Sequence, residues 1–305
     1  MSKPRPANIA HSVRQRLLNI SREKGEDPNL VFIRYALERF LYRLSRSDKA
    51  GQFILKGAML FAVWTGRPHR PTRDLDLLGF GSDSAEGLIR TFQQIIAVEV
   101  EPDGLVFEPQ SISVSEIREG MEYSGKRVKL VARLGSTQRI PLQIDIGFGD
   151  VVTPQAQEID YPTLLDLPAP HIRAYPPETV VAEKLQALVA FDMAISRMKD
   201  FYDLWIISKQ FSFEGAVLAE AIRATFHRRN TAIPSETPTA LTDNFAADQG
   251  KQMQWRAFLK RTGLEKVAVE LLQVVAELRV FLLPPLFGPA RGVPFDKSWA
   301  DGSWS

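Results

Sequence analysis

Asp74-Leu75-Asp76-Leu77-Leu78-Gly79 is the most informative stretch of the sequence. Its apolar residues predict a short strand. Side chains two positions apart on a strand point to the same face, so Asp74 and Asp76 share one face and the leucines point into the core. Two carboxylates this close repel each other unless a cation compensates them. The stretch therefore predicts a strand that holds a metal ion, although an Asp-x-Asp pattern alone is weakly specific.

A third carboxylate lies in a second apolar segment, residues 140–147, where Asp145 stands between two isoleucines. An unpaired buried carboxylate is costly, so Asp145 needs a cation or hydrogen-bond donors, unless it faces water on an edge strand. If the two strands are adjacent, Asp74, Asp76 and Asp145 form a cluster. Such a cluster could hold two Mg²⁺ or Mn²⁺ ions about 3.5–4 Å apart, as two-metal phosphoryl transfer requires.

Hydrophobic periodicity predicts both helices and strands along the chain. A strand is expected over residues 127–134, and a segment rich in proline, residues 154–177, reads as a linker. Helices are expected over residues 9–20, 29–46, 86–96, 178–191, 198–208, 213–226 and 263–281. The tail after Pro284 is expected to be irregular.

These elements predict an α+β protein with two lobes. The N-terminal lobe, residues 1–155, has a helical part over 1–50 and a mixed catalytic sheet over 51–155. The C-terminal lobe, residues 156–305, is mainly helical and is expected to complete the active site.

Composition narrows the class of protein. Of 305 residues, 45% are hydrophobic and 24% charged, which is ordinary for a globular protein. The absence of cysteine excludes disulfides, thiolate metal sites and cysteine nucleophiles. The four histidines are scattered, which argues against zinc sites and catalytic triads. The N-terminus has no apolar signal segment and the apolar runs are short, so we expect a cytoplasmic protein with no membrane partner.

Positive charge is concentrated near the N-terminus, where residues 1–50 contain eleven Lys and Arg against five Asp and Glu. This excess would suit a polyanion such as RNA, and a solvated helix face is the alternative explanation. The candidate RNA contacts are Arg14, Arg16, Arg39 and Arg43, with Arg223, Arg228 and Arg229 as a second possible group.

Two predicted helices of the C-terminal lobe carry charged residues. Lys184 interrupts an amphipathic helix and could bind nucleotide phosphates as a point charge. Asp200 and Asp203 are three residues apart and share a helical face. The other reading is a salt bridge between Lys184 and one of these carboxylates, and the residues alone leave both readings open.

Five segments occur in a fixed order over roughly residues 51 to 205, namely Leu55-Lys56-Gly57-Ala58-Met59-Leu60, Arg73-Asp74-Leu75-Asp76, Asp145, Ala182-Glu183-Lys184-Leu185 and Arg197-Met198-Lys199-Asp200-Phe201-Tyr202-Asp203. Together they resemble the AbiEii/AbiGii toxin family of nucleotidyltransferases, in the DNA polymerase β-like superfamily. The resemblance implies a toxin of a bacterial toxin–antitoxin or phage-defence operon, with a nucleotidyltransferase fold. It implies Mg²⁺-dependent transfer of a nucleotide from an NTP to an RNA acceptor, the 3′ end of tRNA. It also implies an antitoxin with a winged-helix domain.

The resemblance suggests a role for each matching residue. It makes Asp74 and Asp76 metal ligands, Lys184 the helix lysine of the family, and Asp200 and Asp203 the acidic residues of its last motif. We expect the catalytic residues to be Asp74, Asp76, Asp145, Lys184 and Asp203. We expect the nucleotide to contact Lys56, Gly57, Arg73, Lys184 and Asp200. The metal ligands are expected to be Asp74, Asp76 and Asp145.

The chain departs from the superfamily pattern in one motif. A hydroxyl residue usually follows the glycine of the first motif, and here the sequence is Gly57-Ala58-Met59. Phosphate contacts are then expected from backbone N–H groups after Gly57, from Lys56 or from Arg73. The departure keeps two other functions open: a nucleotide- or RNA-binding protein without catalysis, and a metal-dependent phosphohydrolase.

Overall fold

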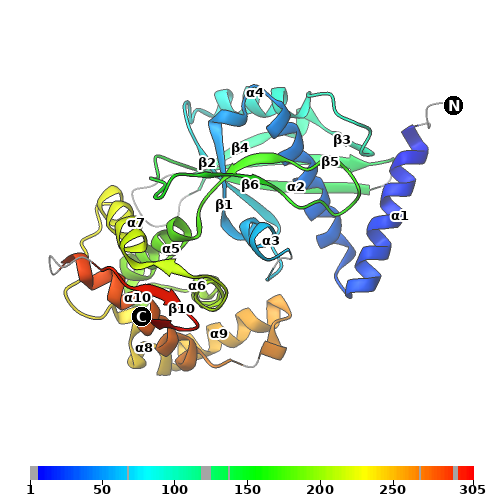
Figure 1. The fold of residues 1–305 in the computed structure, drawn as a ribbon. Helices are drawn as coiled ribbons and strands as arrows, with labels where there is room; N and C mark the ends of the chain where they lie inside the picture. The colour runs from blue at the N-terminus through cyan, green and yellow to red at the C-terminus, as the bar shows by residue number, and fades with distance from the viewer. Residues whose placement is uncertain (1–5, 67–68, 118–124, 137, 268, 291–294) are drawn as a thin grey trace. The chain divides into compact units, whose positions relative to one another are not determined.

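The computed structural model describes residues 6–66, 69–117, 125–136, 138–267, 269–290 and 295–305 (Figure 1). The chain forms two compact units. The first consists of Met1–Gly149 and Gln157–Ala174, and the second of Asp150–Ala156 and Tyr175–Ser305. This division differs from the predicted boundary between residues 155 and 156, because residues 157–174 join the sheet of the first unit.

A mixed sheet is the centre of the first unit, with the strand order β3-β5-β6-β2-β1-β8-β7 and with β4 paired to β5. β2 (Asp74–Gly79) runs antiparallel to β1 (Phe53–Lys56) and parallel to β6 (Gln138–Phe148). The remaining strands are β3 (Leu105–Phe107), β4 (Ser113–Ile117), β5 (Gly125–Leu134), β7 (Gln157–Asp160) and β8 (His171–Ala174). The predicted α+β class with a mixed sheet is confirmed.

β7 and β8 form where the sequence indicated only a linker. β8 pairs in parallel with β1, and β7 pairs antiparallel with β8 at the edge of the sheet. Three of the prolines, Pro162, Pro168 and Pro170, lie in the connection between the two strands, where no ladder hydrogen bond is needed. The proline content therefore marked a loop inside the sheet unit.

The helices α2 and α4 cover one face of this sheet (Figure 1). The helices of the unit are α1 (Pro6–Lys24), α2 (Pro28–Arg46), α3 (Leu60–Thr65) and α4 (Ala85–Ile96), with short 3₁₀ segments at Ala50–Gln52, Gly57–Met59 and Pro109–Ser111. Phe40 of α2 stacks on Phe92 of α4 with ring centroids 5.3 Å apart, and Phe92 meets Phe53 of β1 edge-on. The core of the first unit therefore lies between α2, α4 and the face of the sheet that carries Leu75 and Leu77.

The second unit is mainly helical, as predicted. Its helices are α5 (Pro177–Phe191), α6 (Met198–Gln210), α7 (Gly215–Arg228), α8 (Asp243–Ala247), α9 (Gln249–Thr262) and α10 (Leu271–Ala290), with 3₁₀ segments at Asp192–Ala194, Thr239–Leu241 and Glu265–Val267. The predicted helix over 263–281 is shifted, and α8 and α9 were not predicted. α10 packs against α6, α7 and α8.

The end of the chain is ordered, contrary to the expected irregular tail. α10 continues through Pro284 and Pro285, and β10 (Ser298–Ala300) pairs with both β11 (Ser303–Trp304) and β9 (Phe213–Glu214). A proline inside a helix leaves the carbonyl four residues earlier without its donor. The indole N–H of Trp304 donates to that carbonyl, Phe281 O, at 3.0 Å. The C-terminal hairpin thus satisfies the backbone group that Pro285 leaves unpaired.

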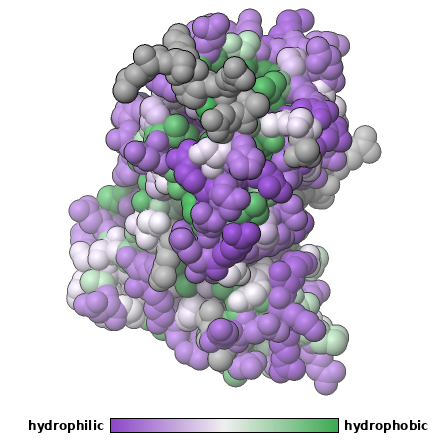
Figure 2. Space-filling model, turned by 90° about the vertical axis from the view of Figure 1, so that its right-hand side faces the viewer, coloured by the Kyte–Doolittle hydropathy of each residue, from purple (hydrophilic) through white to green (hydrophobic). Residues whose placement is uncertain are grey.

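α10 is also long and apolar enough to cross a membrane by length and composition, over Leu271–Gly288. In the structure 44% of that window is buried, and Val274, Leu278 and Phe281 are fully buried within the second unit. On the side drawn in Figure 2, hydrophilic residues cover most of the surface and apolar residues form only small patches. The apolar face of α10 therefore belongs to a protein core.

Candidate active site

The strand that carries the Asp-x-Asp pair lies inside the sheet. Leu75 and Leu77 are fully buried on the side of the helices, and Asp74 and Asp76 are half-buried on the opposite face. This alternation is the one that the sequence predicted. Through the strand register, Asp76 lies opposite Lys56 of β1 and opposite Asp145 of β6. The strands on either side of β2 therefore bring a cation, Lys56, and a third carboxylate, Asp145, to the same face.

Gly57 shows how closely the backbone approaches this pair. It follows β1 directly and has a positive φ of 77°, which favours glycine. A Cβ atom at this position would lie 2.0 Å from Oδ2 of Asp76, far inside van der Waals contact. The glycine is therefore required both by the turn and by the space that the Asp76 carboxylate occupies.

Asp145 has a partner that the sequence did not reveal. The Arg127 guanidinium on β5 donates two hydrogen bonds to it, Nε to Oδ1 at 2.8 Å and Nη2 to Oδ2 at 2.7 Å. In the part of the chain that the structure describes, no group of three His, Asp or Glu side chains is arranged to hold a metal ion. In this structure Asp145 is paired with Arg127, and its role as a third metal ligand stays a prediction.

The remaining pair still fits a divalent cation. Asp74 and Asp76 offer carboxylate oxygens from one face of a strand, and such oxygens are the ligands that Mg²⁺ prefers. Lys56 and Arg73 flank them, Lys56 in register with Asp76 and Arg73 exposed just before β2. The turn before β2 spans residues 66–73, of which 67 and 68 lie outside the described residues.

A second charged cluster lies within the second unit, on α5 and α6. Lys184 Nζ contacts Asp200 Oδ1 at 2.6 Å and Asp203 Oδ2 at 2.8 Å. Both carboxylates are 0% exposed, and the lysine side chain is 13% exposed. Arg197 Nε also contacts Asp200, at 2.8 Å. The salt bridge considered for Lys184 is therefore present, and it joins the lysine to both acidic residues.

The charges around Asp200 decide its protonation. Burial by itself would raise the pKa of this carboxyl, but Lys184, Arg197 and Lys199 outweigh that effect and hold the pKa below its ordinary value. The buried carboxylate is therefore ionised at neutral pH, and its negative charge is compensated by neighbouring cations.

Arg229 is a structural residue that sequence reasoning misplaced among possible RNA contacts. Its guanidinium contacts Asp150 at 2.9 Å and Glu183 at 3.3 Å, and donates to Gln186 Oε1 at 2.9 Å. Burial alone would lower the pKa of Arg229, but the charges of the two carboxylates raise it. Because Glu183 precedes Lys184, this network fixes the part of α5 that carries the lysine. No local pattern could have indicated it, since Asp150 is 79 residues away.

Two arginines of the basic N-terminal segment are also structural. Arg39 is 1% exposed and donates to the carbonyl of Pro168, and Arg43 is 6% exposed and forms two hydrogen bonds with Asp103. Neither side chain is available to RNA, so the predicted contacts at these two positions are wrong. Arg14 is half-buried and Arg16 is exposed.

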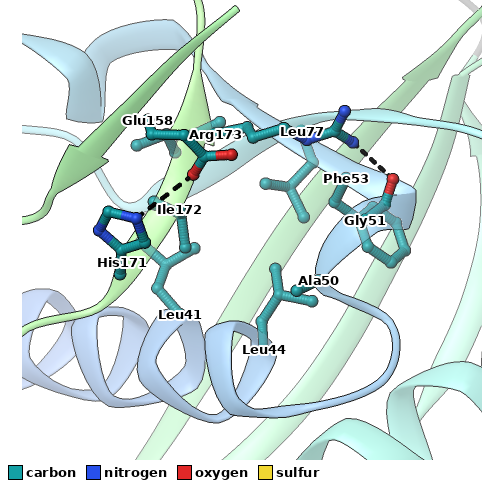
Figure 3. Close-up of a pocket in the computed structure, with 11 residues that line it drawn as sticks. Leu41, Leu44, Ala50, Gly51, Phe53, Leu77, Glu158, His171, Ile172 and Arg173 are labelled. Carbon is teal, nitrogen blue, oxygen red and sulfur yellow. Dashed lines mark hydrogen bonds and ion pairs between the residues drawn. The ribbon is translucent and has the colours of Figure 1, made fainter.

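A small cavity of about 270 Å³ has Leu77 of β2 among its lining residues (Figure 3). Leu41, Leu44 and Leu77 contribute to its apolar floor, and Glu158 and His171 lie at its rim, joined by an ion-pair contact. The Asp160 side chain, through its hydrogen bond, raises the pKa of His171. Because Leu77 belongs to the buried face of β2, this cavity is separate from the carboxylate face.

Two carboxylates on one face of a strand can hold the metal ions that phosphoryl transfer uses. The chain belongs to the family described as nucleotidyl transferase AbiEii toxin of type IV toxin–antitoxin systems, whose model matches residues 39–274. The resemblance seen in the sequence is thereby confirmed. Membership of this family makes the protein a toxin-type nucleotidyltransferase. It also implies that the protein uses an NTP substrate and has a cognate antitoxin.

Several solved structures are similar to the chain. MenT4, a nucleotidyltransferase toxin from Mycobacterium tuberculosis, is 15% identical, with a TM-score of 0.49 over 87% of this chain and 98% of that one. JHP933 from Helicobacter pylori is 15% identical, with a TM-score of 0.48 over 84% of this chain and 92% of that one. A search of curated proteins finds no match.

Proposed function

We propose that this protein transfers a nucleotide from an NTP to the 3′ end of a tRNA, in the cytoplasm, as the toxin of a toxin–antitoxin pair that acts in phage defence. The observation that carries the proposal is the Asp74–Asp76 pair, which shares one face of β2 and has the Gly57 backbone against it, in a chain of the AbiEii family.

Asp74 and Asp76 are the proposed ligands of Mg²⁺ or Mn²⁺. The ion, when bound, would offset the charge of the triphosphate and that of the departing pyrophosphate. Asp145 lies beside Asp76 in the register, and we assign it to orienting the acceptor hydroxyl, with Arg127 setting its position. Asp145 is also the proposed third ligand of the metal ion.

The triphosphate is assigned to groups that stand in for the missing hydroxyl. Lys56 and Arg73 supply positive charge beside the carboxylate pair, and the backbone N–H groups after Gly57 supply donors. Lys184, held by Asp200 and Asp203, is proposed to bind a phosphate of the nucleotide as a point charge. The cognate antitoxin is proposed to carry a winged-helix domain.

Incubation with total tRNA, Mg²⁺ and each labelled NTP in turn tests the proposal. We expect label from one NTP in tRNA together with release of pyrophosphate, and no label when EDTA replaces Mg²⁺. Hydrolysis of the NTP without an acceptor would instead identify a phosphohydrolase. Nucleotide binding with neither hydrolysis nor transfer would identify a non-catalytic binding protein.

A further inference from the structure

The sheet face that carries Asp74 and Asp76 continues onto the long strands β5 and β6 (Figure 1). Residues paired across neighbouring strands share a face. Asp74 pairs with Gln143 of β6, Gln143 pairs with Lys129 of β5, and Arg133 pairs with Arg139 further along the same two strands. With buried Val131 and exposed Pro141 between them, these pairs form a row of side chains that leads away from the carboxylate pair.

This row is basic and open to solvent. Lys129 and Arg139 are exposed, and the Arg133 side chain is 47% exposed. Arg127 is two positions before Lys129 on β5 and pairs across the strands with Asp145. Arg133 forms an ion pair with Glu108, and Arg127 with Asp145. Among the residues that the structure describes, Lys129 and Arg139 have no carboxylate partner. The face therefore carries a net positive charge along β5 and β6.

Uncharged groups on the same face also suit an RNA strand. Ser113 and Ser115 of β4 are exposed and pair with Lys129 and Arg127, so their hydroxyls accompany the cations. Val106 of β3, which is 66% exposed, pairs with Arg133. Hydroxyl donors beside cations can bind phosphate oxygens, and exposed apolar groups can contact sugars or bases.

The arrangement favours a chain of phosphates over an isolated anion. Positions two apart on an antiparallel strand are about 7 Å apart, so Arg127 and Arg133 lie about 20 Å from each other. Cations spread over such a length neutralise several phosphates at once, which drives polyanion binding through release of counterions. The exposed basic residues of this row, unlike the buried Arg39 and Arg43, are also accessible.

We propose that the face formed by Lys129, Arg133 and Arg139, with Ser113 and Ser115, binds the sugar–phosphate backbone of the acceptor tRNA. It leads the tRNA 3′ end toward Asp74 and Asp76. This inference rests on the proposed transfer to tRNA, and it moves the RNA-binding surface from the N-terminal helices to the sheet.

Charge reversal of the row in the full-length protein tests the inference. The variant Lys129→Glu/Arg133→Glu/Arg139→Glu should weaken binding of unfractionated tRNA by about tenfold or more. It should lower the slope of log affinity against log salt by roughly 2–3, since each lost phosphate contact removes about 0.7–0.9. Transfer to a trinucleotide with the tRNA 3′ sequence should fall less than transfer to tRNA, because so short an acceptor reaches only the Lys129 end of the row.

The matched control reverses three cations that are exposed elsewhere in the first unit and were not predicted to contact RNA, as Arg22→Glu/Lys24→Glu/Arg90→Glu. It changes the net charge equally and should leave the affinity for tRNA within about twofold of the parent. If the triple variant of the row folds poorly, Lys129→Gln/Arg139→Gln provides a milder change that breaks no described ion pair.

Two outcomes would overturn the inference: unchanged tRNA affinity in the variants of the row, or a larger loss in the control. If tRNA affinity is unchanged, reduced binding of poly-glutamate by the same variants would assign the face to an acidic protein. Failure of the parent to transfer nucleotides to any acceptor would contradict the proposed function alone, because tRNA binding still reports on the row.

Discussion

The chain contains two pairs of closely spaced aspartates that differ in burial and in their partners. Asp74 and Asp76 are half-buried on one face of a strand, where a carboxylate pair can face a ligand. Asp200 and Asp203 are fully buried between helices, and Lys184 contacts both. A buried carboxylate needs a compensating charge within the fold, whereas a half-exposed one can meet its charge in a bound ion. The first pair is therefore expected to govern activity, and the second to govern stability as well.

The largest effect is expected for Asp74→Ala or Asp76→Ala. Loss of one metal ligand should reduce nucleotide transfer by about 10³-fold or more, equivalent to roughly 4 kcal/mol. Stability without metal should stay the same or rise slightly, since one of two repelling charges is removed. Urea unfolding and transfer rates measured on the same samples check both parts. A clear loss of stability in metal-free buffer would make these residues structural.

Lys184→Met should lower the free energy of unfolding by about 3–5 kcal/mol, because it leaves two buried carboxylates with less compensation. The apolar stem of the side chain is kept, so lost packing contributes little. The double variant Lys184→Met/Asp203→Asn should recover much of that stability. If the double variant also recovers transfer in proportion to its folded fraction, Lys184 has no role with the nucleotide.

Glu38 is another buried acidic residue, and unlike Asp200 it has a raised pKa. Burial raises its pKa to about 7, and the opposing effects of Arg39 and of the Leu164 N–H do not overcome this. Because the folded pKa lies above the ordinary value of 4.5, the stabilising contribution is complete below pH 4.5 and is lost as the pH rises through 7. The loss between pH 5 and pH 8 should be at most about 3 kcal/mol.

Glu38→Gln keeps an oxygen to accept the Leu164 N–H and should flatten that pH dependence. Asp48→Asn, which changes an exposed carboxylate, should keep the slope of the parent. Urea unfolding of the three proteins at several pH values distinguishes them. Equal slopes in the parent and in Glu38→Gln would show that Glu38 is ionised throughout this range.

The variant Gly57→Ala tests the close approach of the backbone to Asp76. A positive φ costs an alanine about 1–2 kcal/mol, and the new methyl group would also displace the Asp76 carboxylate. Gly66→Ala is the matched control, since Gly66 has a similar φ of 72° and, among the described residues, no atom within 4 Å of the place that a methyl group would take. Both variants should lose similar backbone stability, and only Gly57→Ala should lose transfer activity. Equal activity in the two would mean that Asp76 tolerates displacement.

Much of the fold could be predicted because it is encoded in local patterns. β2 was predicted over its full length, and α5 and α6 were predicted within two residues at each end. Strand alternation and helical periodicity depend on neighbours in sequence, so residues a few positions apart suffice to show them. The same alternation is enough to place Asp74 and Asp76 on one face of their strand.

Only the tertiary structure decided the partners. Arg127 neutralises Asp145, Arg43 is buried against Asp103, and the C-terminal hairpin supplies a donor to Phe281. Each contact joins segments from 18 to 60 residues apart. A charged side chain has the same local pattern whether it faces water or a buried counter-ion, so the sequence showed where the charges are. Whether each charge serves folding or binding depended on which strands and helices the fold places beside it.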